Sequence, residues 1–451
     1  MKEEQIKKYV LFSPVGTHDP VGVSDEDGKA SEGSMLHIIR HYKPEIVYLY
    51  ITKELDYKDN RYKKAIKKFH PSCEVIEKFS ELDEDDANNY DAFINDFKKY
   101  IKEIYDKYNK KGYEILLNIA SGTPQIKSNL ILEVITNNIK LIPVQVDTPT
   151  KKKNFEDKFE FSALDNIDTV KEEKRNRCKE PGILSFKRAK IQSQIESLIE
   201  NYEYSASYNL FKDIDDISDL FNNKLLKYLL HAYLRVNLKY EEAKKVITFS
   251  SDNNINLTND ENKLLEYYYV MKIKQKKGEL SDFILRITPF VTDLLFYYLK
   301  KQVPALNKVL IDSKKDGKQI CIYASPDNIL ISRYEKRFNN FKNNFKKGDD
   351  FINLDRLLTI MEHYKNKNIS SNLIDMFSSI RKIEIKIRNN VAHRMINITE
   401  KFIKEKVGLS SNTILRKNEE LLKIIIPKIN TNYFLYDEIN QKIIDLLQEH
   451  K

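Results

Sequence analysis

Two residues near the C-terminal end of the chain have side chains that could transfer a proton and stabilise negative charge. Arg388 and His393 lie five positions apart in the stretch IRNNVAHRM, and Asn389 directly follows the arginine. Histidine titrates near neutral pH, so it can accept or donate a proton during a reaction. Arginine keeps its charge and can direct two hydrogen bonds at oxygens that become negative in a transition state. Chemistry of this kind needs no metal ion.

The spacing of the two residues does not by itself define a catalytic site. Five positions turn an α-helix by about 500°, a net rotation of about 140°, so Arg388 and His393 do not share a helix face. Two copies of the helix that meet in a dimer would supply paired arginines and histidines. The alternative is a surface arginine beside a partly buried histidine. A second pair, Arg356 and His363 in LDRLLTIMEHY, lies in an apolar stretch that favours a packed histidine.

The composition indicates a multidomain protein of a reducing compartment. At 451 residues the chain is too long for one ordinary hydrophobic core. No apolar run reaches the ~18 residues that a membrane-spanning helix needs, and the charged start MKEEQIKKYV does not resemble a signal peptide. Cys73, Cys178 and Cys321 are too scattered for a metal site or a disulfide framework. These features predict a cytoplasmic protein, and the net charge of +9 permits a polyanionic partner.

The elements that would position these residues fall into two kinds. Short apolar stretches at residues 9–14, 45–51, 73–79, 113–120 and 140–147 predict strands, and amphipathic helices are expected between them. Strands that alternate with helices predict a mostly parallel, Rossmann-like α/β domain over residues 1–180. The remainder predicts all-α domains at 181–278 and 279–451, interrupted near DSKKDGKQICIYASPDN by a loop or a small hairpin.

Two polar loops of the α/β domain could hold an anion. One follows the first strand and begins SPVGTHDP, and the other follows the fourth strand and reads NIASGTPQ. Ligands of parallel sheets collect where strands end and helices begin. Gly122 would let the backbone approach a ligand closely, Ser121 and Thr123 offer hydroxyls, and the next helix presents free N–H groups. The alternative is an ordinary helix capped by Thr123 with Pro124 in its first turn. Neither a Walker lysine nor a GxGxxG motif is present, which argues against an NTPase or a dinucleotide enzyme.

These motifs in this order closely resemble the CARF–HEPN ribonucleases that accompany type III-A CRISPR systems. The resemblance covers essentially the whole chain and implies a CARF sensor domain, a central helical domain and a C-terminal HEPN ribonuclease domain. It assigns catalysis to Arg388 and His393, with Asn389 at the polar position beside them. It also assigns the binding of a cyclic oligoadenylate to Ser13, Gly16, Thr17, His18, Asp19, Asn118, Ser121, Gly122, Thr123 and Gln125. The first loop continues as VSDEDGKASEG, which is longer and more acidic than the family pattern.

The resemblance implies a metal-independent endoribonuclease that acts as a homodimer on single-stranded RNA. The 2′-hydroxyl of RNA is the nucleophile, His393 moves its proton, and Arg388 stabilises the phosphorane, so the products carry 2′,3′-cyclic phosphates. The allosteric activator is expected to be a cyclic oligoadenylate, with cyclic hexa-adenylate favoured over cyclic tetra-adenylate. No cofactor, metal site, membrane contact or stable DNA binding is expected.

Two rival functions belong to other classes. A CARF-type ligand-sensing regulator would need a DNA-binding helix-turn-helix, and the C-terminal region shows no basic recognition helix. A HEPN protein that serves only as a structural dimer or toxin partner would not need both Arg388 and His393. A third possibility adds to the main hypothesis, namely that the sensor domain degrades its own ligand.

Overall fold

The computed structural model describes residues 7–23, 30–56, 60–82, 90–147, 176–247, 257–303, 310–315, 319–324, 354–365, 369–393, 397–430 and 433–449. The chain divides into two compact units. The first consists of Met1–Glu196, Asn209–Asn223 and Glu449–Lys451, and the second of Ser197–Tyr208 and Lys224–Gln448.

The first unit is built around a six-stranded sheet in the order β5-β4-β1-β6-β7-β8. The strands are β1 (Lys8–Pro14), β4 (Ile46–Ile51), β5 (Glu74–Phe79), β6 (Tyr113–Asn118), β7 (Leu141–Val146) and β8 (Cys178–Lys179). All neighbouring pairs are parallel except β7 with β8. The chain builds the sheet outward from β1 in one direction and then crosses to β6 on the other side. The strand order therefore reverses between β1 and β6.

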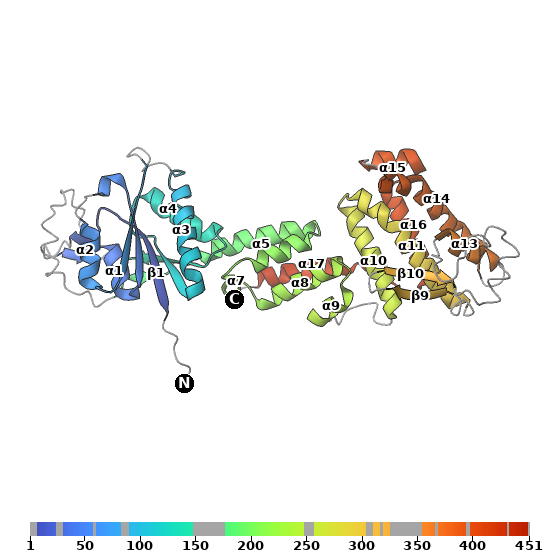
Figure 1. Ribbon diagram of the computed structural model, residues 1–451, viewed down its shortest axis with the longest axis horizontal. Helices are drawn as coiled ribbons and strands as arrows, with labels where there is room; N and C mark the ends of the chain where they lie inside the picture. The colour runs from blue at the N-terminus through green and yellow to red at the C-terminus, as the bar shows by residue number, and fades with distance from the viewer. Residues whose placement is uncertain are drawn as a thin grey trace, which may run out of the picture. The chain divides into compact units, whose positions relative to one another are not determined.

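Helices cover both faces of this sheet, which explains why the central strands are nearly continuous apolar runs. Figure 1 shows α1 (Ser34–Tyr42) and α2 (Arg61–Phe69) on one side and α3 (Ile94–Tyr108) and α4 (Pro124–Thr136) on the other. Each face has its own core: Ile39 of α1 and Ile66 of α2 contribute to one, and Phe97 of α3 and Leu130 of α4 to the other. The five predicted strands and the α/β class are confirmed.

A small hairpin, β2 (Val21–Val23) with β3 (Ala30–Glu32), interrupts the loop after β1, and Val21 pairs with Glu32. Neither this hairpin nor the short strand β8 was predicted from the sequence.

The remaining elements are almost all helical, as predicted. They are α5 (Leu184–Glu200), α6 (Tyr204–Lys212), α7 (Ile217–Leu220), α8 (Asn223–Val236), α9 (Tyr240–Val246), α10 (Asn259–Lys276), α11 (Leu280–Gln302), α13 (Leu354–His363), α14 (Ser371–His393), α15 (Glu400–Val407), α16 (Ser411–Ile425) and α17 (Leu435–Gln448). The exception is an antiparallel hairpin of β9 (Leu310–Lys315) and β10 (Gln319–Ala324), at the place where a loop or small hairpin was expected.

In the second unit, α14 packs against α11 and α16. Its buried face includes Phe377, Ile380 and Ile387, which are almost fully inaccessible. The Thr288 hydroxyl of α11 donates a hydrogen bond of 2.6 Å to the buried Glu384 carboxylate. This apolar and polar packing fixes the helix that carries the predicted catalytic pair.

Candidate functional site

The two predicted loops of the α/β unit meet at the point where the strand order reverses. Gly16 belongs to the loop after β1, and Gly122 to the loop after β6. A Cβ atom at Gly16 would lie 2.9 Å from the backbone nitrogen of Gly122 and 3.6 Å from Cα of Ser121. A side chain at position 16 would therefore push the loops apart. The structure brings the two motifs into one place, because β1 and β6 are neighbouring parallel strands whose carboxyl ends lie at the same edge of the sheet.

The side chain of Asn118, at the end of β6, connects the segments of the two loops through hydrogen bonds. Its Nδ2 donates to Oγ of Ser13 at 2.8 Å and to Oγ of Ser121 at 2.9 Å. Its Oδ1 accepts the backbone N–H of Ala120 at 2.9 Å and that of Ser121 at 3.3 Å. Ser13, Asn118 and Ser121 are all buried. These three side chains shape the loops and do not present their polar atoms to solvent.

Asp19 fastens the first loop to the start of α1. One carboxylate oxygen accepts the backbone N–H of Gly16 and the other that of Met35, both at 3.0 Å. The N-cap residue of α1 is Gly33, which has no side chain to cap the helix, so Asp19 supplies this acceptor from outside. Burial raises the pKa of Asp19, while hydrogen bonds from Ser121, Met35 and Gly16 oppose the rise.

Other predicted ligand contacts lie nearer the surface. Thr17 and His18 are exposed, and Gly122, Thr123 and Gln125 are half-buried. Oγ1 of Thr123 accepts the N–H of Ile126 at 3.3 Å and so caps α4, which begins at Pro124. The capping interpretation is therefore confirmed for Thr123, and it does not prevent a ligand from meeting the same helix end.

Gln125 offers a hydrogen-bonding group near the start of α4. Its Oε1 atom is buried and has no hydrogen-bond partner among the residues that the structure describes. An acceptor in this situation usually meets a ligand or an ordered water.

Lys127 is a basic residue of this region that the sequence analysis missed. It lies in the first turns of α4, where its N–H bonds to the carbonyl of Thr123 at 3.1 Å. Burial lowers the pKa of Lys127, and the negative charge of Asp19 opposes that shift. It does not belong to a Walker motif. The signal was a lysine four positions after the helix-capping Thr123, on the same side of the helix as the cap.

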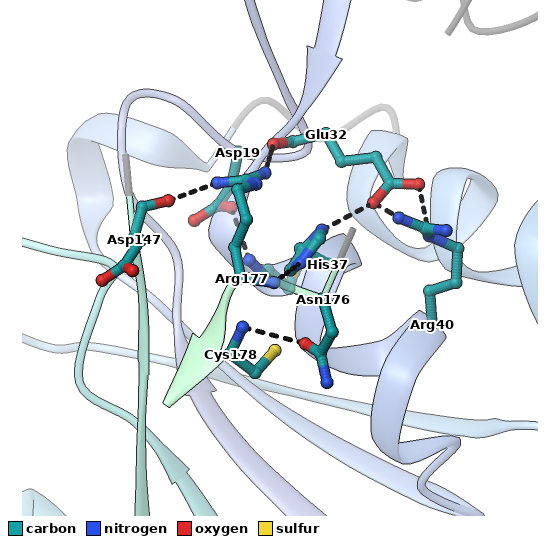
Figure 2. Close-up of polar contacts among 9 residues, drawn as sticks. Asp19, Glu32, His37, Arg40, Asp147, Asn176, Arg177 and Cys178 are labelled. Atoms are coloured by element: carbon teal, nitrogen blue, oxygen red, sulfur yellow. Dashed lines mark hydrogen bonds and ion pairs between the residues drawn. The ribbon is translucent and has the colours of Figure 1, made fainter. Parts of the chain in front are cut away.

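A buried polar network adjoins Asp19 (Figure 2). Nδ1 of His37 lies 3.0 Å from Glu32, and Nε2 of His37 accepts the backbone N–H of Arg177 at 3.0 Å. Arg40 pairs with the same Glu32 carboxylate at 2.7 Å. Burial alone would raise the pKa of Glu32, but hydrogen bonds from His37 and Arg40 outweigh it and hold the pKa below its ordinary value.

The partners of His37 fix its tautomer. A carboxylate only accepts, so Nδ1 carries a hydrogen, and a backbone N–H only donates, so Nε2 does not. Because Nε2 is already occupied, this carboxylate–histidine pair cannot act as a general base and is structural.

The predicted catalytic residues lie in the last turns of α14. Arg388, Asn389 and His393 all fall within this helix, so the helical prediction is confirmed, but their side chains lie outside the described residues. The same holds for the rival residues Arg356 and His363 on α13.

Two further properties concern the described part of the chain. No group of three or more His, Cys, Asp or Glu side chains within it could hold a metal ion. None of its helices is both long and apolar enough to cross a membrane.

Comparison with known proteins defines the class. Three models of one family match consecutive parts of the chain: the Cas_Csm6 CARF domain over residues 65–182, the Csm6 6H domain over 181–236 and the Cas_Csm6 HEPN domain over 250–444. The fold and these matches define a protein that joins a CARF domain to a HEPN domain. The chain belongs to the Csm6 family of such proteins, so the family resemblance is confirmed.

Curated relatives match over nearly the full length. The CRISPR system endoribonuclease Csm6 of Enterococcus italicus is 26% identical over 97% of this chain and 100% of the relative. The protein of that name from Mycobacterium tuberculosis is 24% identical over 96% of this chain and 98% of its own. A solved structure, Enterococcus italicus Csm6 bound to cyclic hexa-2′-fluoro-hexa-dAMP, is similar in fold with a TM-score of 0.68, at 23% identity, and covers 97% of this chain and 100% of the other.

Proposed function

We propose that this protein is an endoribonuclease of type III CRISPR defence that cleaves single-stranded RNA when a cyclic oligoadenylate binds its α/β unit. The observation that carries the proposal is the close approach of Gly16 and Gly122 at the strand-order reversal, in a chain whose α14 also carries Arg388 and His393. Its relatives are named as CRISPR endoribonucleases, which agrees with this activity.

The proposed domains are a Rossmann-like CARF sensor at residues 1–180, a central helical domain at 181–278 and a HEPN domain at 279–451. The strand order on either side of β1 supports the Rossmann-like description of the sensor.

The residues of the proposed ligand site have two different roles. Thr17, His18, Gly122, Gln125 and Lys127 are the candidates for direct contact. The buried side chains of Ser13, Asp19, Asn118 and Ser121 hold the loops in shape, while Gly16 permits the close approach and Thr123 caps α4. A cyclic oligoadenylate carries one negative charge per nucleotide, and the start of α4 and Lys127 both favour an anion. Cyclic hexa-adenylate is the favoured ring, because the similar Enterococcus structure holds a cyclic hexanucleotide analogue.

The proposed catalysis requires two copies of the chain. Arg388 and His393 lie five positions apart on α14, so their side chains leave one helix in different directions. A homodimer that joins two α14 helices would combine the pairs. His393 would take the proton from the 2′-hydroxyl as its oxygen attacks the phosphorus, and the P–O5′ bond would break while the 5′-oxygen takes a proton from solvent. Arg388 would stabilise the phosphorane, and Asn389 would orient the reacting phosphate.

Cleavage of the ligand by the sensor itself is a separate activity. The buried Glu32–His37 pair cannot supply its base, because both ring nitrogens are engaged. Such an activity would fall to exposed groups such as Thr17 and His18.

The test of this function is an analysis of RNA products. We expect single-stranded RNA to be cut in the presence of cyclic hexa-adenylate and EDTA, with 2′,3′-cyclic phosphate ends. A matched reaction with linear hexa-adenylate serves as the control and should remain at the basal rate. Products with 3′-hydroxyl ends, or activity that returns only with added divalent ions, would contradict the proposed chemistry. Ligand-dependent binding to duplex DNA without RNA cleavage would favour the regulator instead.

A further inference from the structure

The strand β8 is a short edge strand of the sheet. It consists only of Cys178 and Lys179, which pair with Val146 and Gln145 of β7. A strand this short makes few backbone hydrogen bonds, and a two-residue edge pairing has little stability of its own. The residue just before it, Arg177, is only 7% exposed.

Arg177 reaches three separate segments of the first unit (Figure 2). Its backbone N–H donates to Nε2 of His37 on α1 at 3.0 Å. Its guanidinium donates to the carbonyl of Asp147, just after β7, at 2.5 Å and to the carbonyl of Glu32, at the end of β3, at 3.4 Å. The buried guanidinium thus joins the sheet edge to the β2–β3 hairpin, and the backbone N–H of the same residue joins both to α1.

The partners of Arg177 are continuous with the proposed ligand loop. Glu32 pairs with Val21 in the hairpin, and the N–H of Gly33 bonds to the carbonyl of Pro20 at 2.9 Å. Pro20 directly follows Asp19, whose carboxylate holds Gly16 and the first turn of α1. A displacement of residues 16–20 would therefore also displace the hairpin and α1, to which Arg177 is hydrogen-bonded.

After Arg177 and β8, the chain leaves the sheet. From β8 the chain runs through Glu180 and Pro181 to α5. The Tyr42 hydroxyl of α1 donates to the Glu180 carboxylate at 2.9 Å, which ties this connection to the same helix. Because α5 begins in the first unit and ends in the second, β8 is the covalent route by which the chain leaves the sheet.

We propose that Arg177 is a positioning residue for activation: it transmits the ligand-dependent position of the first loop to β8 and hence to α5. This inference rests on the proposed function, since it concerns how a bound ring changes the rate of RNA cleavage. Physically, the ligand favours one arrangement of residues 16–20, and the Arg177 hydrogen bonds make β8 follow that arrangement. The coupling free energy between the two sites then depends on Arg177.

A purely structural role for Arg177 predicts something different. It would change stability, and it would leave the ratio of stimulated to basal cleavage unchanged in the molecules that remain folded. The stimulation ratio therefore separates the two roles.

The experiment compares Arg177→Met with Lys179→Met. Lys179 lies two positions after Arg177, in β8, and its exposed side chain forms an ion pair of 2.5 Å with the Asp147 side chain, so its replacement is the matched control. RNA cleavage is titrated with cyclic hexa-adenylate and cyclic tetra-adenylate, and ring affinity is measured separately by calorimetry. We expect Arg177→Met to lower the stimulation ratio by about tenfold or more while ring affinity changes by less than about threefold. Lys179→Met should match the wild type in both measurements.

The remaining outcomes contradict either this inference or the proposed function on which it rests. A wild-type stimulation ratio in folded Arg177→Met overturns the inference and leaves the proposed function intact. If wild-type protein itself shows no stimulation by either ring, the proposed function fails first. If Arg177→Met does not fold, His37→Asn takes its place under the same criteria. It removes the Nε2 acceptor for the Arg177 N–H and leaves an amide that can donate to Glu32. If both variants unfold, the network serves stability alone and the inference is overturned.

Discussion

At the scale of single residues, Arg388 and His393 should matter for the transition state and little for binding. Replacing either with alanine should abolish ligand-stimulated cleavage, because proton transfer and charge stabilisation act only during the reaction. Ring affinity should stay within about twofold of the wild type, since the ring is proposed to bind in another unit. The matched control is His363→Ala, which should keep most of the activity. Loss of cleavage in His363→Ala with full activity in His393→Ala would reassign the site to α13.

Lys127 gives a cleaner test of the ligand site than the glycine of the NIASGTPQ loop. Gly122 has φ of +90°, and a Cβ there would lie 2.8 Å from Cγ2 of Ile126, so Gly122→Val would strain the loop with or without a ligand. Lys127→Met keeps the shape and removes the charge. It should raise the ring concentration for half-maximal cleavage by about tenfold, as expected for one charge-assisted hydrogen bond.

The control for Lys127 is Lys102→Met on the exposed face of α3, which should leave the titration unchanged. Identical titrations for Lys127→Met and wild type would remove Lys127 from the ligand site.

His231 should make the second unit sensitive to acid. Burial and the neighbouring Arg235 lower the pKa of His231 to about 4, while its Nδ1–H donates to the carbonyl of Ala243 at 2.9 Å. Well above pH 6.5 the histidine is neutral whether folded or unfolded, so it has no effect on the pH dependence there. Between pH 6.5 and 4 only the unfolded state gains the proton, and the free energy of unfolding should fall by up to about 3 kcal/mol.

Urea unfolding followed by circular dichroism at several pH values measures this loss. His231→Leu should show a flatter dependence between pH 6.5 and 4 than the wild type. Equal slopes for the two proteins would contradict the assignment to His231.

At the scale of elements, the connection between α5 and the sheet depends on a buried ion pair. Nζ of Lys187 lies 2.8 Å from the Asp216 carboxylate, and both residues are nearly inaccessible to solvent. Lys187 also donates to the carbonyl of Ile139, just before β7, at 3.3 Å. Asp216→Ala should therefore lower the free energy of unfolding of the first unit by about 3–5 kcal/mol, because it leaves a buried charge without its partner.

A neighbouring surface pair provides the comparison. Lys140 and Asp219 also lie 2.8 Å apart, but their side chains are 44% and 48% exposed. Asp219→Ala should cost no more than about 1 kcal/mol. Urea unfolding of both variants is the measurement, and equal losses for the two would show that burial does not set the strength of the Lys187 pair.

The elements differ in whether they could be predicted from the sequence. The five long strands were predicted because burial on both faces leaves an apolar run in the sequence. The hairpin β2–β3 and the strand β8 were not, because they are short and are held by Arg177 and Glu32, which lie far apart in the chain. The two loops meet because β1 and β6 are neighbours, an order that was not predicted from the sequence. Which side chains turn inward was not predicted either, since Asn118 and Asp19 are buried by contacts that only the folded chain creates.

At the scale of the whole molecule, the proposed function requires that a cyclic oligoadenylate bound at the sheet changes the rate of RNA cleavage in the helical unit. A ligand can change the cleavage rate only as far as it favours the active arrangement over the inactive one. Variants of the two sites should therefore have different effects. Sensor variants should raise the concentration of cyclic oligoadenylate needed for half-maximal cleavage, and catalytic variants should abolish cleavage at any concentration.

The proposed activation is measured directly by the rate of single-stranded RNA cleavage by the full-length protein across a titration of cyclic hexa-adenylate. We expect wild-type protein to respond to the ring, Lys127→Met to reach a similar maximal rate at about tenfold higher ring concentration, and His393→Ala to remain inactive at saturation. A wild-type rate that is the same with and without cyclic hexa-adenylate and cyclic tetra-adenylate would contradict the account.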